Sequence, residues 1–220
     1  MSNYFMGIDF GTGGAKGCII DMEANVLGYS FREEAIINLK PGWSEHNPTL
    51  YWEITKKLIK QCIGKSGIQS KNIKGIAVSS ALPCMVMIDK KGNPIKNAYN
   101  LMDRRANKEV EWIKKNIGEE YYFKITGNRL DDHPSIVNLM WERNNRPGSF
   151  KKIFKALTIE GYINYKLTGK FTLANQNATF VGAYNLIKKD FDKDILGRIG
   201  LDREIFPELY CSNDIIGEVT

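Results

Sequence analysis

The sequence predicts an α/β fold with one mixed, five-stranded sheet flanked by helices. Three observations support this prediction. Three apolar segments lie within the first 33 residues and are separated only by short turns, which is typical of an antiparallel meander. An amphipathic segment with an apolar residue at every fourth position follows, and a further apolar strand comes after it. A strand reached through a helix joins the sheet in parallel, so the sheet combines both pairing directions.

The meander consists of predicted strands over residues 4–10, 16–22 and 26–33. A loop over residues 34–46 leads to a helix that begins at Asn47-Pro48-Thr49, because proline is favoured at the first helical position. Gly64 and Gly67 are expected to end this helix. We expect it to bury one stripe of side chains, formed by Leu50, Ile54, Leu58 and Cys62.

The remaining predicted strands cover residues 73–79 and 85–89, which brings the sheet to five. Further helices are expected over residues 103–115, 134–145 and 190–200, and another follows a short strand at residues 155–159 and runs to Leu167. Helices on both faces of the sheet would bury its apolar strands. The length of 220 residues fits one large domain or two small ones.

The composition narrows the functional classes. The four cysteines form no CxxC pair and the two histidines are far apart, which argues against a zinc site of the usual spacing. Free thiols indicate a reducing compartment, so we expect a cytoplasmic protein, without a signal peptide or membrane span. The net charge of +6 comes from dispersed lysine pairs with no interleaved aromatic residues, so we expect no nucleic-acid partner.

A glycine-rich hairpin is the most informative motif. Asp9 lies where the first strand ends, Gly11, Thr12, Gly13 and Gly14 form the turn, and Lys16 opens the second strand. Backbone amides in such a turn form an anion-binding concavity, and a carboxylate beside it can hold Mg²⁺ together with phosphate oxygens. The alternative is a plain hairpin in which Asp9 caps a strand and Lys16 is an exposed lysine. A hairpin alone does not require an acid before the glycines and a base after them, so the phosphate site is favoured.

The segment Asp9-x-Gly11-Thr12-x-x-x-Lys16 resembles the first phosphate motif of the actin, Hsp70 and sugar-kinase superfamily. Within it, the chain resembles the N-terminal domain of the FGGY carbohydrate kinases, and xylulose kinases most nearly. The hairpin is neither a Walker loop nor a Rossmann fingerprint, because no Gly-Lys-Ser/Thr follows and a strand succeeds the glycines. Further tracts resemble the family in the same order, at residues 157–169, 177–179, 205–209 and 216–219.

The resemblance implies a ribonuclease-H-like, actin-like ATPase domain with inserted helical sugar-binding segments. It also implies ATP and Mg²⁺ as cofactors. In this interpretation Asp9 organises Mg²⁺ through water, while Gly11, Thr12 and Gly13 contact phosphate oxygens. Lys16 matches the family's basic position and would neutralise phosphate charge.

The acceptor site is implied by the same resemblance, which places the loop over residues 79–84 in the sugar cleft. Leu82-Pro83 stands where typical xylulose kinases carry Met-His and glycerol kinases carry Arg-Glu. The loss of those hydrogen-bonding groups argues against glycerol and leaves the identity of the polyol open. The alternative is a simple proline-bearing loop.

Two further residues are candidates for sugar binding. Asp103 lies in a segment that resembles the family's Trp-x-Asp-x-Arg, with the tryptophan replaced, and could accept hydrogen bonds from sugar hydroxyls while Arg105 orients it. Alternatively, Asp103 is a favourable charge at a helix start. His133 aligns with a sugar-contacting aromatic residue of glycerol kinases, and the alternative is an ordinary loop histidine.

The family's catalytic base is an aspartate in a Gly-Asp-Asn/Gln motif that follows the Gly-Glu-Val tract, and this sequence contains no Gly-Asp pair. The base is therefore expected beyond Thr220, and residues 1–220 are expected to be the N-terminal domain of a longer kinase, without its C-terminal ATP-binding domain. The expected partners are ATP and a small sugar or polyol, with a possible homodimer. The alternatives are a kinase for another substrate such as gluconate or ribulose, an actin-like nucleotide switch, and a noncatalytic sugar sensor.

Overall fold

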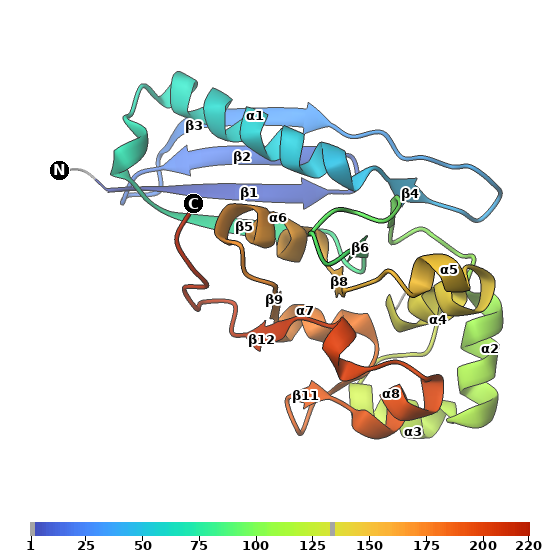
Figure 1. Cartoon of the computed structure of the whole chain (residues 1–220). Coiled ribbons are helices and arrows are strands. Elements are labelled where there is room, and N and C mark those ends of the chain that lie inside the picture. Colours follow the sequence, from blue (N-terminus) through green and yellow to red (C-terminus); the bar gives the residue numbers. More distant parts are fainter. Residues whose placement is uncertain (1–2, 133–134) are drawn as a thin grey trace.

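A four-stranded mixed sheet forms the N-terminal part of the fold in the computed structural model, which describes residues 3–132 and 135–220 (Figure 1). The strand order is β3-β2-β1-β5. β1 is antiparallel to β2 and parallel to β5, while β2 is antiparallel to β3, so the predicted mixed sheet and its meander are confirmed. The strands are β1 (Tyr4–Gly11), β2 (Gly14–Ile20), β3 (Val26–Glu33) and β5 (Ile73–Ser80).

The prediction of a fifth strand in this sheet is wrong for the described part of the chain. The segment expected to supply it forms β6 (Val86–Ile88), which pairs antiparallel with β8 (Lys155–Leu157) instead of β5. The loop after Ser80 leads the chain away from the sheet, and Met85 exchanges backbone hydrogen bonds with Tyr99. Partners distant in sequence therefore occupy the backbone groups of this segment.

Helix α1 (Pro48–Ser66) covers one face of the sheet. The Asn47 side chain caps its start by accepting from the Thr49 amide at 3.0 Å, and Gly67, with φ of 68°, ends it. Gly64 lies inside the helix and does not end it. The helix packs closely, because a Cβ on Gly28 of β3 would lie 2.4 Å from the Cys62 carbonyl oxygen.

The buried stripe of α1 differs from the prediction at its first residue. Ile54, Leu58 and Cys62 are buried, but Leu50 is 44% exposed and Tyr51 is buried in its place. A four-residue repeat drifts around a helix with 3.6 residues per turn, so the first member of the series leaves the core face.

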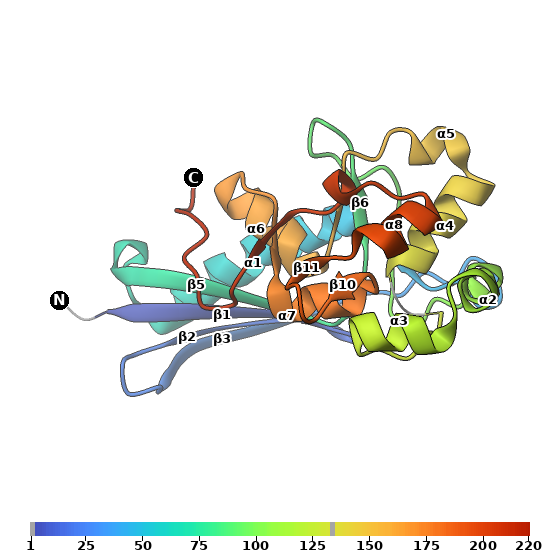
Figure 2. The same ribbon diagram turned by 90° about the horizontal axis from the view of Figure 1, so that it is seen from below.

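The second helix on this face is α6 (Ile159–Thr168), which shares a core with α1, β1 and β8 (Figure 2). The opposite face carries half-exposed aromatic side chains, Phe5, Tyr29 and Phe31. Among the described residues, helices therefore cover one face of the sheet only, in contrast to the expected covering of both.

The remaining helices form a second body with its own core, visible at the lower right of Figure 1. These are α2 (Asn107–Asn116), α3 (Glu119–Thr126), α4 (Ser135–Asn145), α5 (Pro147–Phe150), α7 (Asn175–Ala178) and α8 (Lys193–Ile199). Short strands join them as the pairs β4 (Glu45–His46) with β7 (Ala98–Tyr99), β9 (Thr172–Ala174) with β12 (Glu208–Tyr210), and β10 (Tyr184–Asn185) with β11 (Asp190–Phe191). Three single turns of 3-10 helix complete the described chain, at Ser70–Asn72, Thr179–Val181 and Arg203–Ile205.

Several helix boundaries differ from the predictions. α2 begins four residues later than expected, because Asp103 forms a turn with Asn100, and α3 was not predicted. α8 begins at Lys193, since residues 190–191 pair as a strand. α4 agrees with the prediction, although the proline expected to start it lies outside the described residues. None of the described helices has both the length and the apolar character needed to cross a membrane.

Candidate functional site

The glycine hairpin connects β1 to β2 through a two-residue turn, Thr12-Gly13. Gly14 is essential to its geometry, because its φ is 142° and a Cβ there would lie 2.3 Å from the Arg32 carbonyl oxygen. Gly13 has no atom within 4 Å of its would-be Cβ, so the tip is open. A Cβ on Gly11 would lie 3.8 Å from Oδ2 of Asp9. Because Gly13 and Gly11 have no side chains, there is free space both at the turn and beside the Asp9 carboxylate.

Asp9 and Lys16 lie side by side, as the phosphate-site interpretation requires. The strand register pairs Asp9 with Lys16 on β2 and with Ser79 on β5. All three residues line one cavity of about 460 Å³ on the face of the sheet opposite α1, and most of the remaining lining is apolar. Within the described residues, Asp9 and Lys16 form no ion pair within 4 Å, so both charges are available to a ligand.

Ser79 was not singled out as an individual site residue in the sequence analysis. Its signal was partly present, because it ends an apolar strand that was predicted to join the sheet in parallel, and the structure places that strand beside the strand of Asp9. The carboxyl ends of neighbouring parallel strands meet at one edge of a sheet, so a polar residue at that position falls beside Asp9.

The donor set at the hairpin fits Mg²⁺ carried by a nucleotide. Asp9 is the one carboxylate among the described residues that line this cavity, and no group of three metal-ligating side chains occurs within residues 3–132 and 135–220. Mg²⁺ commonly binds one or two carboxylates and completes its shell with water and phosphate oxygens. Asp9 alone suits that arrangement, whereas a permanently bound metal would need more protein ligands.

The predicted acceptor loop, of which residues 81–84 follow the end of β5, begins beside the hairpin strands. Its first amide, from Ala81, donates to the Phe10 carbonyl at 2.7 Å, and Met85 at its other end is bonded to Tyr99. Leu82 and Pro83 lie between these anchors and are half-buried, while Cys84 is buried. The structure therefore brings the predicted acceptor loop next to the end of β1, where Asp9 and the glycine turn also lie.

Asp103 and Arg105 form a buried ion pair behind this loop. Asp103 Oδ1 accepts from Arg105 Nε at 2.8 Å, and Oδ2 accepts from the Ser44 amide at 2.8 Å. Their side chains are 0% and 1% exposed. Both carboxylate oxygens are thus already in use. Contact between Asp103 and a sugar stays a prediction, and in this structure it would require one of these bonds to be exchanged.

The alternative role of Asp103 as a charge at a helix start is wrong, because α2 begins at Asn107. Arg105 is hydrogen-bonded to the Asp103 carboxylate, and two aromatic rings and a second acid surround its guanidinium. Its guanidinium lies 3.8 Å from the Trp43 ring centroid and 4.4 Å from that of Tyr99. Nη2 donates to Glu45 Oε1 at 2.7 Å.

The pKa values follow from this pairing. Burial opposes the charge of Arg105, but hydrogen bonds to Asp103 and Glu45 outweigh it and raise the pKa of the guanidinium above its ordinary value. Burial by itself would raise the pKa of the Glu45 carboxyl, but hydrogen bonds from Arg105 and Asn97 outweigh it and lower this pKa below its ordinary value. The cluster is therefore charged on both sides at neutral pH.

A second ion pair extends the cluster into α4. Lys96 Nζ lies 2.6 Å from Glu142 Oε1 and 3.7 Å from Glu45 Oε1. Burial lowers the pKa of Lys96, although the two carboxylates act to raise it. The rings of Trp43 and Trp141 meet edge to face at 5.4 Å beside it. Glu45, Lys96 and Glu142 were missed by the sequence analysis, since no local pattern relates such distant positions. His133 lies outside the described residues.

Comparison with known proteins agrees with these features. Residues 4–220 match the N-terminal domain of the FGGY family of carbohydrate kinases. The xylulose kinase of Staphylococcus xylosus is 29% identical, over 99% of this chain and 44% of that kinase. The glycerol kinase of Thermococcus onnurineus is 32% identical, over 99% of this chain and 45% of that kinase.

Solved structures show the same fold. The xylulose kinase from Rhodospirillum rubrum superposes with a TM-score of 0.94 at 21% identity, covering 99% of this chain and 45% of that one. The gluconate kinase from Lactobacillus acidophilus gives a TM-score of 0.93 at 23% identity, covering 100% and 44%. The chain thus spans less than half the length of these relatives. Because the match to the family's N-terminal domain extends over residues 4–220, the chain belongs to the FGGY family of carbohydrate kinases, through that domain.

Proposed function

We propose that this chain is the N-terminal, acceptor-binding half of an ATP-dependent kinase that phosphorylates a hydroxyl group of a sugar or polyol, most like xylulose. The single observation that carries the proposal is the placement of Asp9, Lys16 and the open glycine turn beside the acceptor loop. Relatives with this domain are named xylulose, glycerol and gluconate kinases. In this proposal a second domain supplies the adenine site and the aspartate base.

Phosphoryl transfer depends on positioning and charge stabilisation more than on covalent chemistry. Lys16 would neutralise phosphate charge, and the amides of the open turn, at Gly11, Thr12 and Gly13, would donate to phosphate oxygens. Asp9 would hold Mg²⁺ through a bound water. When bound, Mg²⁺ supplies further positive charge at the transferring group. The hairpin thereby fixes the donor end of the reaction.

The acceptor end differs from that of glycerol kinases. Leu82 and Pro83 offer no side-chain hydrogen bonds, so the acceptor hydroxyls must be recognised by other groups, and a polar analogue leaves unpaired groups at high cost. This loop argues against glycerol and leaves the other polyols open. The similarity to xylulose kinases is the reason that we favour xylulose, with ribulose, gluconate or another polyol as competing substrates. The four cysteines are free thiols, which supports the proposed cytoplasmic location. Homodimer formation stays a prediction.

The test uses the complete polypeptide. Pentuloses, hexuloses, polyols and aldonates are screened by thermal shift, since a ligand of the native state raises the melting temperature in a concentration-dependent manner. Substrate-dependent ADP release with Mg²⁺ is then measured, and we expect turnover of roughly 1–100 s⁻¹ for one class. The isolated 220-residue chain should show negligible turnover and weak ATP binding. Binding of a sugar without any ATP turnover by the complete protein would favour a noncatalytic sensor instead.

A further inference from the structure

Glu160 is a buried carboxylate that belongs to neither the glycine hairpin nor the cluster around Arg105. It lies in the first turn of α6, is 4% exposed, and has no ion-pair partner among the described residues. A buried charge without a counter-ion persists only where hydrogen bonds satisfy its oxygens. Its partners therefore show what this carboxylate holds together.

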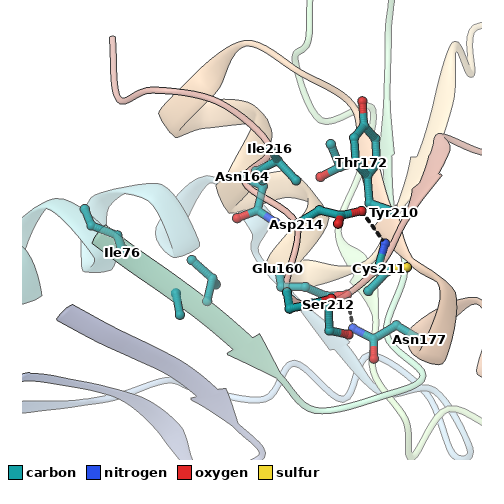
Figure 3. Close-up of a pocket in the computed structure, with 14 residues that line it drawn as sticks. Ile76, Glu160, Asn164, Thr172, Asn177, Tyr210, Cys211, Ser212, Asp214 and Ile216 are labelled. Atoms are coloured by element: carbon teal, nitrogen blue, oxygen red, sulfur yellow. Dashed lines mark hydrogen bonds between the residues drawn. The ribbon is translucent and has the colours of Figure 1, made fainter. Parts of the chain in front are cut away.

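Three segments contribute hydrogen-bond donors to the two carboxylate oxygens, and Figure 3 shows the bond from Asn177. Thr158 Oγ1 and Asn177 Nδ2 each donate to Oε1 at 2.6 Å, and the Ser80 hydroxyl donates to Oε2. The bond to Ser80 is reciprocal, because the backbone amide of Glu160 donates to the Ser80 oxygen at 3.3 Å. The end of β5, the start of α6 and the short helix α7 are thus joined through one side chain.

Helix capping does not account for this arrangement. Thr158 already caps α6 through its side chain, which accepts from the Gly161 amide at 3.3 Å. Gly169 ends the helix with φ of 74°. The bonds that the Glu160 carboxylate accepts from Ser80 and Asn177 are therefore not part of either cap, and they join the helix to other elements.

Ser80 places Glu160 directly behind the candidate site. Ser79 lines the cavity of Asp9, and Ala81 begins the acceptor loop with its bond to Phe10. Through Ser80, this carboxylate thus acts at the start of the loop that carries Leu82 and Pro83.

We propose that Glu160 is a positioning residue that fixes the acceptor loop, residues 81–84, relative to Asp9 and to the helical body. It does not touch the substrate itself. The consequence for the reaction rests on the proposed kinase function, whereas the mechanical role in this chain does not. The two parts are therefore tested separately.

The first test is hydrogen exchange followed by mass spectrometry on the 220-residue chain. In Glu160→Ala, we expect the peptide that contains the Ala81 and Met85 amides to exchange about 10-fold faster than in the wild type, because local opening controls exchange of such amides. Glu160→Gln should give a smaller increase, since its amide oxygen still accepts from Thr158 and Asn177 but its nitrogen cannot accept from Ser80.

Glu109 offers a matched control. It is also a buried glutamate, 5% exposed, in the first turn of a helix, and it accepts one hydrogen bond from Asn144 at 3.0 Å. Glu109→Ala should leave exchange in the acceptor loop unchanged. Equal acceleration in the Glu109 and Glu160 variants would show general destabilisation and overturn the proposal. If Glu160→Ala fails to fold, exchange in Glu160→Gln and in Ser80→Ala is compared with exchange in Glu109→Ala instead.

The second test uses the complete kinase. Glu160→Gln should raise the KM for the acceptor about 10-fold while the KM for ATP changes less than about two-fold, because only the acceptor loop loses an anchor. Glu109→Gln should alter neither value. A wild-type protein without sugar-dependent turnover would refute the proposed function and leave the exchange result standing. An active wild type whose acceptor KM is unaffected in Glu160→Gln would refute the positioning role.

Discussion

Replacing Arg105 by lysine is the most direct test of the buried cluster behind the acceptor loop. The substitution keeps the positive charge but removes the planar fork that bonds two acids and the flat surface that stacks on a ring. In the structure, Arg105 Nε and Nη2 bond Asp103 and Glu45, and the guanidinium lies 3.8 Å from the Trp43 ring centroid. A lysine ammonium can satisfy one of these acids well, but not both.

The expected loss of stability follows from these contacts. A hydrogen bond to a charged group contributes about 1.5–3 kcal/mol, and a buried cation–π contact about 2 kcal/mol. With one hydrogen bond and most of the stacking removed, we expect Arg105→Lys to lower the free energy of unfolding by about 3 kcal/mol. For a chain of this length, that corresponds to a fall in Tm of about 6–12 °C.

Urea unfolding and calorimetry on the 220-residue chain measure this change, with the neighbouring Arg104→Lys as the control. Arg104 pairs with Asp132 at 3.0 Å, but its side chain is 41% exposed. We expect the control to cost about 0.5 kcal/mol or less, as is usual for surface ion pairs. If the two variants differ by less than about 0.5 kcal/mol at equal m values, the buried cluster does not stabilise the fold as argued.

Three further predictions concern the glycine hairpin, Glu45 and Cys84. Gly14→Ala should prevent correct formation of the hairpin, because φ is 142° and a Cβ would lie 2.3 Å from a carbonyl oxygen. Gly13→Ala should instead keep the fold and weaken AMP-PNP binding to the complete protein. Similar Tm values for the two variants would contradict this prediction. Because the folded-state pKa of Glu45 is lowered, its contribution is complete above the ordinary glutamate pKa and is lost as the pH falls below about 4. The difference in unfolding free energy between wild type and Glu45→Gln should therefore shrink between about pH 6 and about pH 3, and a constant difference would argue against the pairing. Burial raises the pKa of Cys84 to about 12. Mass spectrometry should therefore show that iodoacetamide labels the exposed Cys211 and does not label Cys84 until the chain is denatured. Early labelling of Cys84 would mean that the loop opens readily.

Local sequence signals identified the elements that depend on nearby residues. Asn47, Pro48 and Gly67 mark the ends of α1 because capping and proline geometry act within one turn of chain. The position of Leu50 was wrong because its burial depends on the direction from which the sheet meets the helix. α3 was missed although Gly118 and Gly127 flank it, since its eight residues bury few side chains.

The same distinction between local and distant contacts applies to the candidate site. The glycine hairpin, with Asp9 and Lys16 on either side of it, could be predicted from the sequence, because a hairpin of fixed register brings residues near its turn together. Only the packing of whole elements shows that β6 pairs with β8, that Ser44 and Glu45 enclose the pair formed by Asp103 and Arg105, and that Glu160 joins three segments. Those contacts connect positions tens of residues apart. Their formation depends on how whole elements pack, and no periodicity within a short window of sequence carries that information.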